Sequence, residues 1–208
     1  MRKALLSLTP LVAGVAIAAW PASEFDYCQL QITYWDKQKT QVRDRGYIAV
    51  DEKTGKPYKT GEWVTWFQNG TILSRGEYIE GKLHGRWLYW FQTGQKRSDL
   101  TFAAGTPTGL STSWHPNGQK AEERFFGADE LRMTRWHENG QKSNEGNMRG
   151  PFGAAKMDGV WTFWYPNGQK RTESTYKLGK LDGTQTHWDE QGNVTQQTHW
   201  KNGEQVDK

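Results

Sequence analysis

Short runs in which aromatic or β-branched residues alternate with polar ones recur along most of the chain. Segment 158–176 is representative: an alternating run ends at Pro166-Asn167-Gly168, and a second alternating run follows. A period of two predicts a strand, and two such runs around a Gly-containing turn predict a β-hairpin. Six units of this kind occur, each marked by a tryptophan just before the turn. These tryptophans are Trp66, Trp90, Trp114, Trp136, Trp164 and Trp188.

The six tryptophans lie 24, 24, 22, 28 and 24 residues apart by subtraction of their positions. A recurring period of this size predicts a repeat architecture in which stacked neighbours together form the core. We therefore expect an all-β protein, an elongated antiparallel meander of about six stacked hairpins over residues 59–205. Residues 23–58 do not match the repeat, and we interpret them as a divergent N-terminal cap over the open sheet edge. Residues 206–208 form a tail.

The turn residues indicate how each hairpin is closed. Proline fixes φ of Pro166 near −65°, which excludes the type I′ turn common in two-residue hairpins. We expect a type I turn centred on Pro166 and Asn167, with Gly168 in the left-handed region as a G1 bulge. This register would place Trp164 opposite Lys170.

Continuing that register along both strands predicts two aromatic columns on one face of the sheet. Thr162 would lie opposite Thr172, and Tyr176 would share the face of Trp164. Both columns would be core, since so much bare aromatic surface is rare on soluble monomers. Lysine stems between them would cross the tryptophan rings. The predicted structural core is Trp66, Trp90, Trp114, Trp136, Trp164 and Trp188, with Tyr78, Phe102, Phe126, Met148, Tyr176 and Trp200 in the second column.

Aromatic residues on the opposite face are present in only some copies, as expected of a localised patch. Exposed rings there would favour binding of a protein or a sugar, whereas burial would favour a structural spacer. The candidate partner-binding residues are Trp63, Trp87, Tyr89, Trp161 and Phe163.

Two joints between repeats depart from the usual length. The 22-residue step lacks two residues around 126–129, and the 28-residue step gains four between Met148 and Gly159. Insertions in repeat arrays fall in loops on one edge and often form binding surfaces. Drift in a tolerant surface turn is the alternative.

The chain begins with Arg2 and Lys3, followed by an apolar run from residue 4 to 19. This is typical of a secretory signal, so residues 1–22 predict export to the periplasm or cell envelope. The alternative is an uncleaved anchor, which would be the only membrane contact. Removing both basic residues from 27 leaves 25 against 23 acidic ones. Such a balance argues against nucleic-acid binding, and the single cysteine, Cys28, excludes an internal disulfide framework.

Residues for catalysis or metal binding do not form a recognisable pattern. None of the five histidines has a metal-ligand spacing with another histidine or the cysteine. His115 and His137 occupy equivalent repeat positions, which indicates packing. We therefore predict no enzyme activity, no catalytic or metal-binding residues and no cofactor.

The pattern Gly-x-Trp-x-x-Trp, then Asn-Gly-Gln-Lys and Tyr-x-x-Gly-Lys, resembles the bacterial variant of the MORN repeat. The resemblance covers residues 59–205, although Ser111, Met133 and Gln185 replace the first tryptophan in three copies. It implies a rod-like, twisted β-meander without catalytic residues. Eukaryotic relatives are associated with membranes, phosphoinositides and self-association, and bacterial ones are often labelled antitoxin-like.

Three functions fit this sequence. The preferred one is an exported scaffold that binds another protein in the envelope, including an immunity or antitoxin-like role. The alternatives are a cell-wall or glycan-binding module, because sugar rings stack on exposed aromatic side chains, and a structural spacer.

Overall fold

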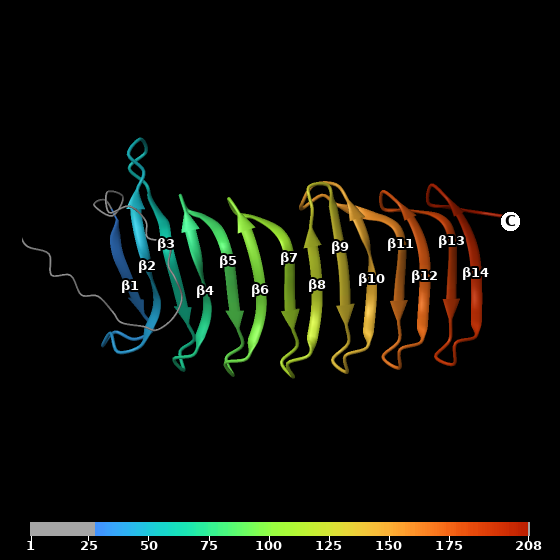
Figure 1. The fold of residues 1–208 in the computed structure, drawn as a ribbon, viewed down its shortest axis with the longest axis horizontal. Coiled ribbons are helices and arrows are strands. Elements are labelled where there is room, and N and C mark those ends of the chain that lie inside the picture. Colours follow the sequence, from blue (N-terminus) through green and yellow to red (C-terminus); the bar gives the residue numbers. More distant parts are fainter. Residues whose placement is uncertain (1–27, 208) are drawn as a thin grey trace, which may run out of the picture.

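The computed structural model describes residues 28–207, so the predicted signal segment 1–22 lies outside the described residues. Within them, the chain forms one open antiparallel sheet of fifteen strands and contains no helix. Each strand pairs with its neighbours in sequence, so the strand order runs from β1 to β15 without a crossover (Figure 1). The predicted all-β meander of hairpins is confirmed. No helix in the described part is long and apolar enough to span a membrane.

Apart from the terminal strands β1 and β15, the strands are seven to ten residues long, because the hairpins repeat the same pattern. They are β1 Gln29–Tyr34, β2 Val42–Val50, β3 Pro57–Trp66, β4 Ile72–Ile79, β5 Lys82–Trp90, β6 Lys96–Ala103, β7 Thr106–Trp114, β8 Lys120–Phe126, β9 Glu130–Trp136, β10 Lys142–Arg149, β11 Lys156–Trp164, β12 Lys170–Lys177, β13 Lys180–Trp188, β14 Val194–Lys201 and β15 Glu204–Val206.

The turns that follow the six tryptophans, here called repeat turns, lie along the lower edge in Figure 1. In the fifth, the Gly168 N–H donates to the Tyr165 carbonyl at 2.9 Å, and the Tyr165 N–H donates to the Gln169 carbonyl at 2.9 Å. Gly168 has a φ of 87°, in the left-handed region. These bonds confirm the predicted turn around Pro166 and Asn167 with a glycine bulge.

The predicted register beyond the repeat turn is wrong by one residue. Trp164 does pair with Lys170, but Phe163 pairs with Thr172, so Arg171 is an additional bulge residue. The corresponding shift follows each of the six repeat turns. Because side chains alternate between faces, one extra residue moves everything beyond it to the other face. The column of Tyr78, Phe102, Phe126, Met148, Tyr176 and Trp200 therefore lies opposite the Trp66 column, not beside it.

We name the two faces by their residues. The Trp–Lys face carries the six column tryptophans, none of which is fully buried. There, lysines of one hairpin lie over tryptophans of the next at 5.0–5.6 Å: Lys96 over Trp114, Lys120 over Trp136, Lys142 over Trp164 and Lys170 over Trp188. Cation–π contacts of this kind hold adjacent repeats together.

The other face, which we name the Trp–Gly face, holds the most buried side chains. Trp63, Trp87 and Trp161 are 5%, 4% and 2% exposed. Each indole covers a glycine of the preceding strand, respectively Gly46, Gly76 and Gly146, where a Cβ atom would clash with the ring. The indole N–H then donates to the carbonyl one residue beyond the glycine, at 2.8–3.1 Å. Burial thus satisfies both the ring and its polar atom.

A strand bend accompanies most repeats. Gly61, Gly85, Gly109, Gly159 and Gly183 have positive φ inside the first strand of a hairpin. A register shift faces each of them on the preceding strand. Bulges bend strands, so each of these strands is bent beside its positive-φ glycine.

The N-terminal hairpin of β1 and β2 has the same geometry despite its divergent sequence. The Trp35 N–H donates to the Gln41 carbonyl at 2.8 Å, as in the repeat turns, and the Trp35 indole donates to the Trp66 carbonyl at 3.2 Å. Gly46 of β2 lies under Trp63. A longer turn, capped by the Asp36 carboxylate, replaces the Asn-Gly turn.

Candidate functional site: a groove at the irregular repeats

The five candidate partner-binding residues lie on the Trp–Gly face, but three of them belong to its core. The rings of Trp63, Trp87 and Trp161 are buried, so they offer no contact surface to a partner. Tyr89 and Phe163 are half-buried and stack on Trp87 and Trp161, with ring centroids 6.0 and 6.2 Å apart. From the sequence we expected exposed rings in a binding protein and buried rings in a structural spacer, so the burial of these three rings favours a spacer. Between Trp87 and Trp161, Ser111 and Met133 take the place of the buried tryptophan.

The pairing of large and small residues changes in that interval. Where β2, β4 and β10 have a glycine under a tryptophan of the next strand, β6 has Leu100 and β7 has Ser111, and Arg124 of β8 pairs with Met133 of β9. No flat ring therefore covers the sheet here. In both places the large side chain lies on the preceding strand, where β2, β4 and β10 have glycine. This keeps the two strands in contact but leaves a hollow where an indole would lie. Between β12 and β13 the same position holds Ser174 and Gln185, which are hydrogen-bonded at 3.0 Å.

The two residues missing from the 22-residue step are absent from β9. Sequence analysis placed this loss around residues 126–129, in the turn before β9. β8 and β9 pair without a register shift from Glu122–Arg135 to Phe126–Leu131. Leu131 stands where the other copies have the positive-φ glycine. The two missing residues are thus those of the bulge, and β9 lacks the feature that bends the equivalent strands.

The four residues added in the 28-residue step form a loop at residues 150–155, between β10 and β11. It contains Gly150 and Gly153, both with positive φ, on either side of Pro151 and Phe152. The Phe152 ring meets the buried Phe126 ring edge-on, with centroids 5.6 Å apart. Phe152 nevertheless remains 57% exposed. The inserted loop therefore places a large apolar side chain at the surface.

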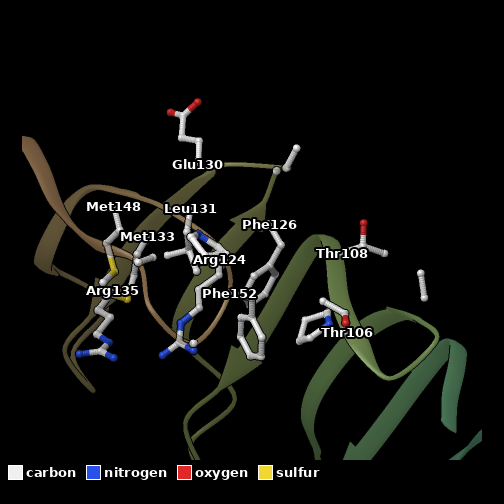
Figure 2. Close-up of a pocket in the computed structure, with 18 residues that line it drawn as sticks. Thr106, Thr108, Arg124, Phe126, Glu130, Leu131, Met133, Arg135, Met148 and Phe152 are labelled. Atoms are coloured by element: carbon white, nitrogen blue, oxygen red, sulfur yellow. The ribbon is translucent and has the colours of Figure 1, made fainter. Parts of the chain in front are cut away.

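Together these two departures form one groove of about 1050 Å³ on the Trp–Gly face (Figure 2). Met133, Leu131 and Met148 line its floor, and Phe126 and Phe152 lie side by side at one wall. Methionine side chains adapt to different apolar shapes. The groove is hence suited to contact with an apolar ligand of variable form.

Charged groups lie along one side of the groove. Figure 2 shows Arg124 and Arg135 pointing in the same direction, whereas Glu130 points away. Both arginines bind Glu122: Arg135 Nε donates to it at 2.6 Å and Arg124 Nη2 at 2.9 Å. The Arg124 Nε atom is 2.8 Å from Glu122, but its N–H is not aligned for a hydrogen bond. One carboxylate thus serves two guanidinium groups.

Two buried polar atoms at this side lack a hydrogen-bond partner among the described residues. They are Arg124 Nε and Asn144 Oδ1. Asn144 lies directly across from Arg135 in the β9–β10 ladder. A buried polar group without a partner costs about 1–3 kcal/mol, so these two atoms lower the stability of the irregular repeats.

The remaining polar residues serve structure. His115 Nε2 donates to the Trp136 carbonyl at 2.9 Å, and His137 Nε2 donates to the Trp164 carbonyl at 3.1 Å. Since a carbonyl oxygen can only accept, both Nε2 atoms carry the proton. These bonds link consecutive repeat turns, as the interpretation of both histidines as packing residues implied. In residues 28–207 no cluster of three or more His, Cys, Asp or Glu side chains is arranged to hold a metal ion.

Sequence analysis located both irregular joints but did not identify Arg124, Met133, Arg135 or Phe152 as site residues. The available signal was the coupled replacement of glycine by Arg124 and of tryptophan by Met133, in the copy that also changes length. That coupling becomes visible only with the correct strand register, because the two positions belong to neighbouring strands.

The MORN repeat variant family model matches residues 59–80, 107–126, 157–178 and 181–202. Each matched segment is one hairpin, formed by β3–β4, β7–β8, β11–β12 and β13–β14. The hairpins β5–β6 and β9–β10 lie between them in the same sheet. No curated protein matches the chain. The matches are to repeats alone and identify no catalytic domain. The chain is a MORN repeat scaffold, built from the variant form of that repeat.

Proposed function

We propose that this protein is a non-catalytic scaffold, exported to the periplasm or cell envelope, that binds another protein through the groove between β7 and β11. The observation that carries the proposal is Phe152, an exposed aromatic side chain on an inserted loop beside an adaptable apolar hollow. Aromatic residues and methionine are enriched where proteins bind one another.

The regular parts of the array serve this site by holding it rigidly. Buried tryptophans on both sides, Trp87 and Trp161, pack the hairpins that flank the groove. An inhibitory role of the antitoxin type would be one case of such binding. The basic and apolar start of the chain supports export, which fractionation of cells that produce the tagged full-length protein would test.

Affinity capture from cell-envelope extract tests the binding proposal. The bait is the tagged full-length protein, compared with its Phe152→Ala and Val160→Ala variants. Val160 is the matched control, because it is 54% exposed but lies next to Trp161 in sequence and so points to the opposite face. We expect a stoichiometric protein partner that Phe152→Ala loses and Val160→Ala retains.

Other outcomes would decide against the proposal. Retention of peptidoglycan or polysaccharide in place of a protein would favour the glycan-binding alternative. Capture of nothing above background would favour a spacer. A partner lost equally in both variants would bind elsewhere than the groove.

A further inference from the structure

We propose that the groove binds an extended peptide segment that carries a carboxylate next to a large apolar side chain. Arg124 and Arg135 would hold the carboxylate, and Phe126, Met148 and Phe152 would contact the apolar side chain. This inference rests on the proposed protein-binding function and specifies the chemistry of the partner at that site.

The charges along the groove favour a carboxylate. Arg124 and Arg135 share Glu122 as their only carboxylate partner among the described residues. Glu130 on the rim points away and pairs with Arg132 at 3.2 Å. One guanidinium is therefore in excess on the groove side, and its planar fork matches a carboxylate in two parallel hydrogen bonds.

The lining favours a peptide over an isolated anion. Arg124 and Arg135 line the same groove as Phe126, Met148 and Phe152. A ligand that meets both sets of side chains needs a charged group and an apolar group on one chain, which neighbouring residues of a peptide supply.

The size and lining of the groove favour several residues of chain. Its volume of about 1050 Å³ lies at the upper end of the range of about 300–1,000 Å³ for ligand pockets, and its lining extends from β7 to the loop at residues 150–155. Phe126, Leu131, Met133, Met148 and Phe152 give it an apolar wall and floor. Because Phe152 stands on a loop between two glycines with positive φ, its exposed ring can lie against a bound side chain. An apolar anchor beside a charged contact is a common arrangement in peptide recognition.

The test begins with selection of random dodecapeptides displayed on phage against the immobilised full-length protein. We expect enriched sequences in which Asp or Glu stands next to Phe, Leu, Ile or Met. A fluorescein-labelled copy of the best peptide is then compared with its amide version, Asn for Asp or Gln for Glu, by fluorescence polarisation. The amide version should bind about tenfold or more weakly, as expected for loss of a charge-assisted contact.

Protein variants assign the loss to the groove. Arg135→Gln should weaken the acidic peptide to the level of the amide peptide and leave the amide peptide unchanged. Arg132→Gln is the matched control, since it lies in the same strand but its side chain lies over Phe125 on the opposite face. The comparison of the acidic peptide with its amide version uses the unchanged protein, so it does not depend on the stability of any protein variant.

Enriched peptides without an acidic residue, or equal affinity for the acidic and amide peptides, would overturn this inference. So would an equal loss in Arg132→Gln and Arg135→Gln, or no enrichment at all. If a partner is still captured and still lost in Phe152→Ala, protein binding stands and only its peptide chemistry fails. If capture fails as well, the proposed function fails with it.

Discussion

Substitution of Gly146 by alanine tests whether the tryptophan–glycine pairs determine the packing of the sheet. Gly146 has an ordinary backbone φ, so alanine is compatible with its conformation. The added Cβ would lie 2.6 Å from Trp161 Cγ and closer still to two other atoms of the ring. Since carbon atoms in contact are about 3.5–4.0 Å apart, the ring must move by about 1 Å. Trp161 is 2% exposed, so no free space receives it.

The expected cost follows from three contributions. Overpacking of a tight core costs about 1–3 kcal/mol. Displacement of the ring also weakens the 2.8 Å hydrogen bond from Trp161 Nε1 to the Asn147 carbonyl, which is worth about 1 kcal/mol. Against this, replacing glycine with alanine restricts the unfolded chain and returns about 0.4–1 kcal/mol. We therefore expect Gly146→Ala to lower the free energy of unfolding by about 1.5–3 kcal/mol.

A double-mutant cycle in urea, followed by far-UV circular dichroism, measures this effect. The second substitution is Trp161→Ser, which copies the serine found at Ser111, where no glycine lies beneath. Without the ring there is no clash, so Gly146→Ala should be neutral or slightly stabilising in that background. The coupling should be about 2–3 kcal/mol. A single-variant loss below about 0.5 kcal/mol, or the same loss in both backgrounds, would refute the packing argument.

Three further predictions concern polar contacts. The hydrogen bond from Arg86 lowers the Asp99 pKa below its usual value, and the Arg86 charge adds to this effect while burial opposes it. The stabilisation by this carboxylate is therefore present above about pH 4 and is lost as pH falls through the folded-state pKa. Asp99→Asn should therefore flatten the acid limb of stability measured by urea titration across pH. His137→Phe should lower the free energy of unfolding, measured in urea, by about 1 kcal/mol, because the hydrogen bond to the Trp164 carbonyl is lost. His137→Tyr should retain most of that stability, because Tyr165 makes the equivalent bond in repeat five. Lys142→Met should cost no more than about 1 kcal/mol in urea unfolding at low salt, and less in high salt, because its contacts are half-exposed.

The repeat period and the turn chemistry predicted the fold. Trp-x-x-Asn-Gly segments at regular spacing indicated a hairpin array, and the proline in Pro166-Asn167-Gly168 indicated the turn geometry that is observed. These features are local, because φ restrictions act within a few residues. The sequence also drew attention to both irregular joints, which the fold brings together in one groove.

The faces of the sheet could not be assigned from the sequence. A second bulge at Arg171, with equivalents in the other hairpins, exchanged the faces of all residues beyond it. No residue type marks this bulge, since Leu73, Ala121, Ser143 and Arg171 are chemically unlike. Prediction of two aromatic columns on one face was wrong for this reason. Three rings of the candidate patch, Trp63, Trp87 and Trp161, belong to the core.

The sequence by itself thus determined the hairpins, their number, their order and their turns, because these depend on alternation and on the backbone preferences of glycine and proline. Only the tertiary structure decided which residues face each other across strands, and therefore which rings are buried and where the sheet is open. Those properties depend on register, and register depends on packing between strands that are distant in sequence. The pair of Arg124 and Met133, which opens the groove, acquires its meaning only in that register.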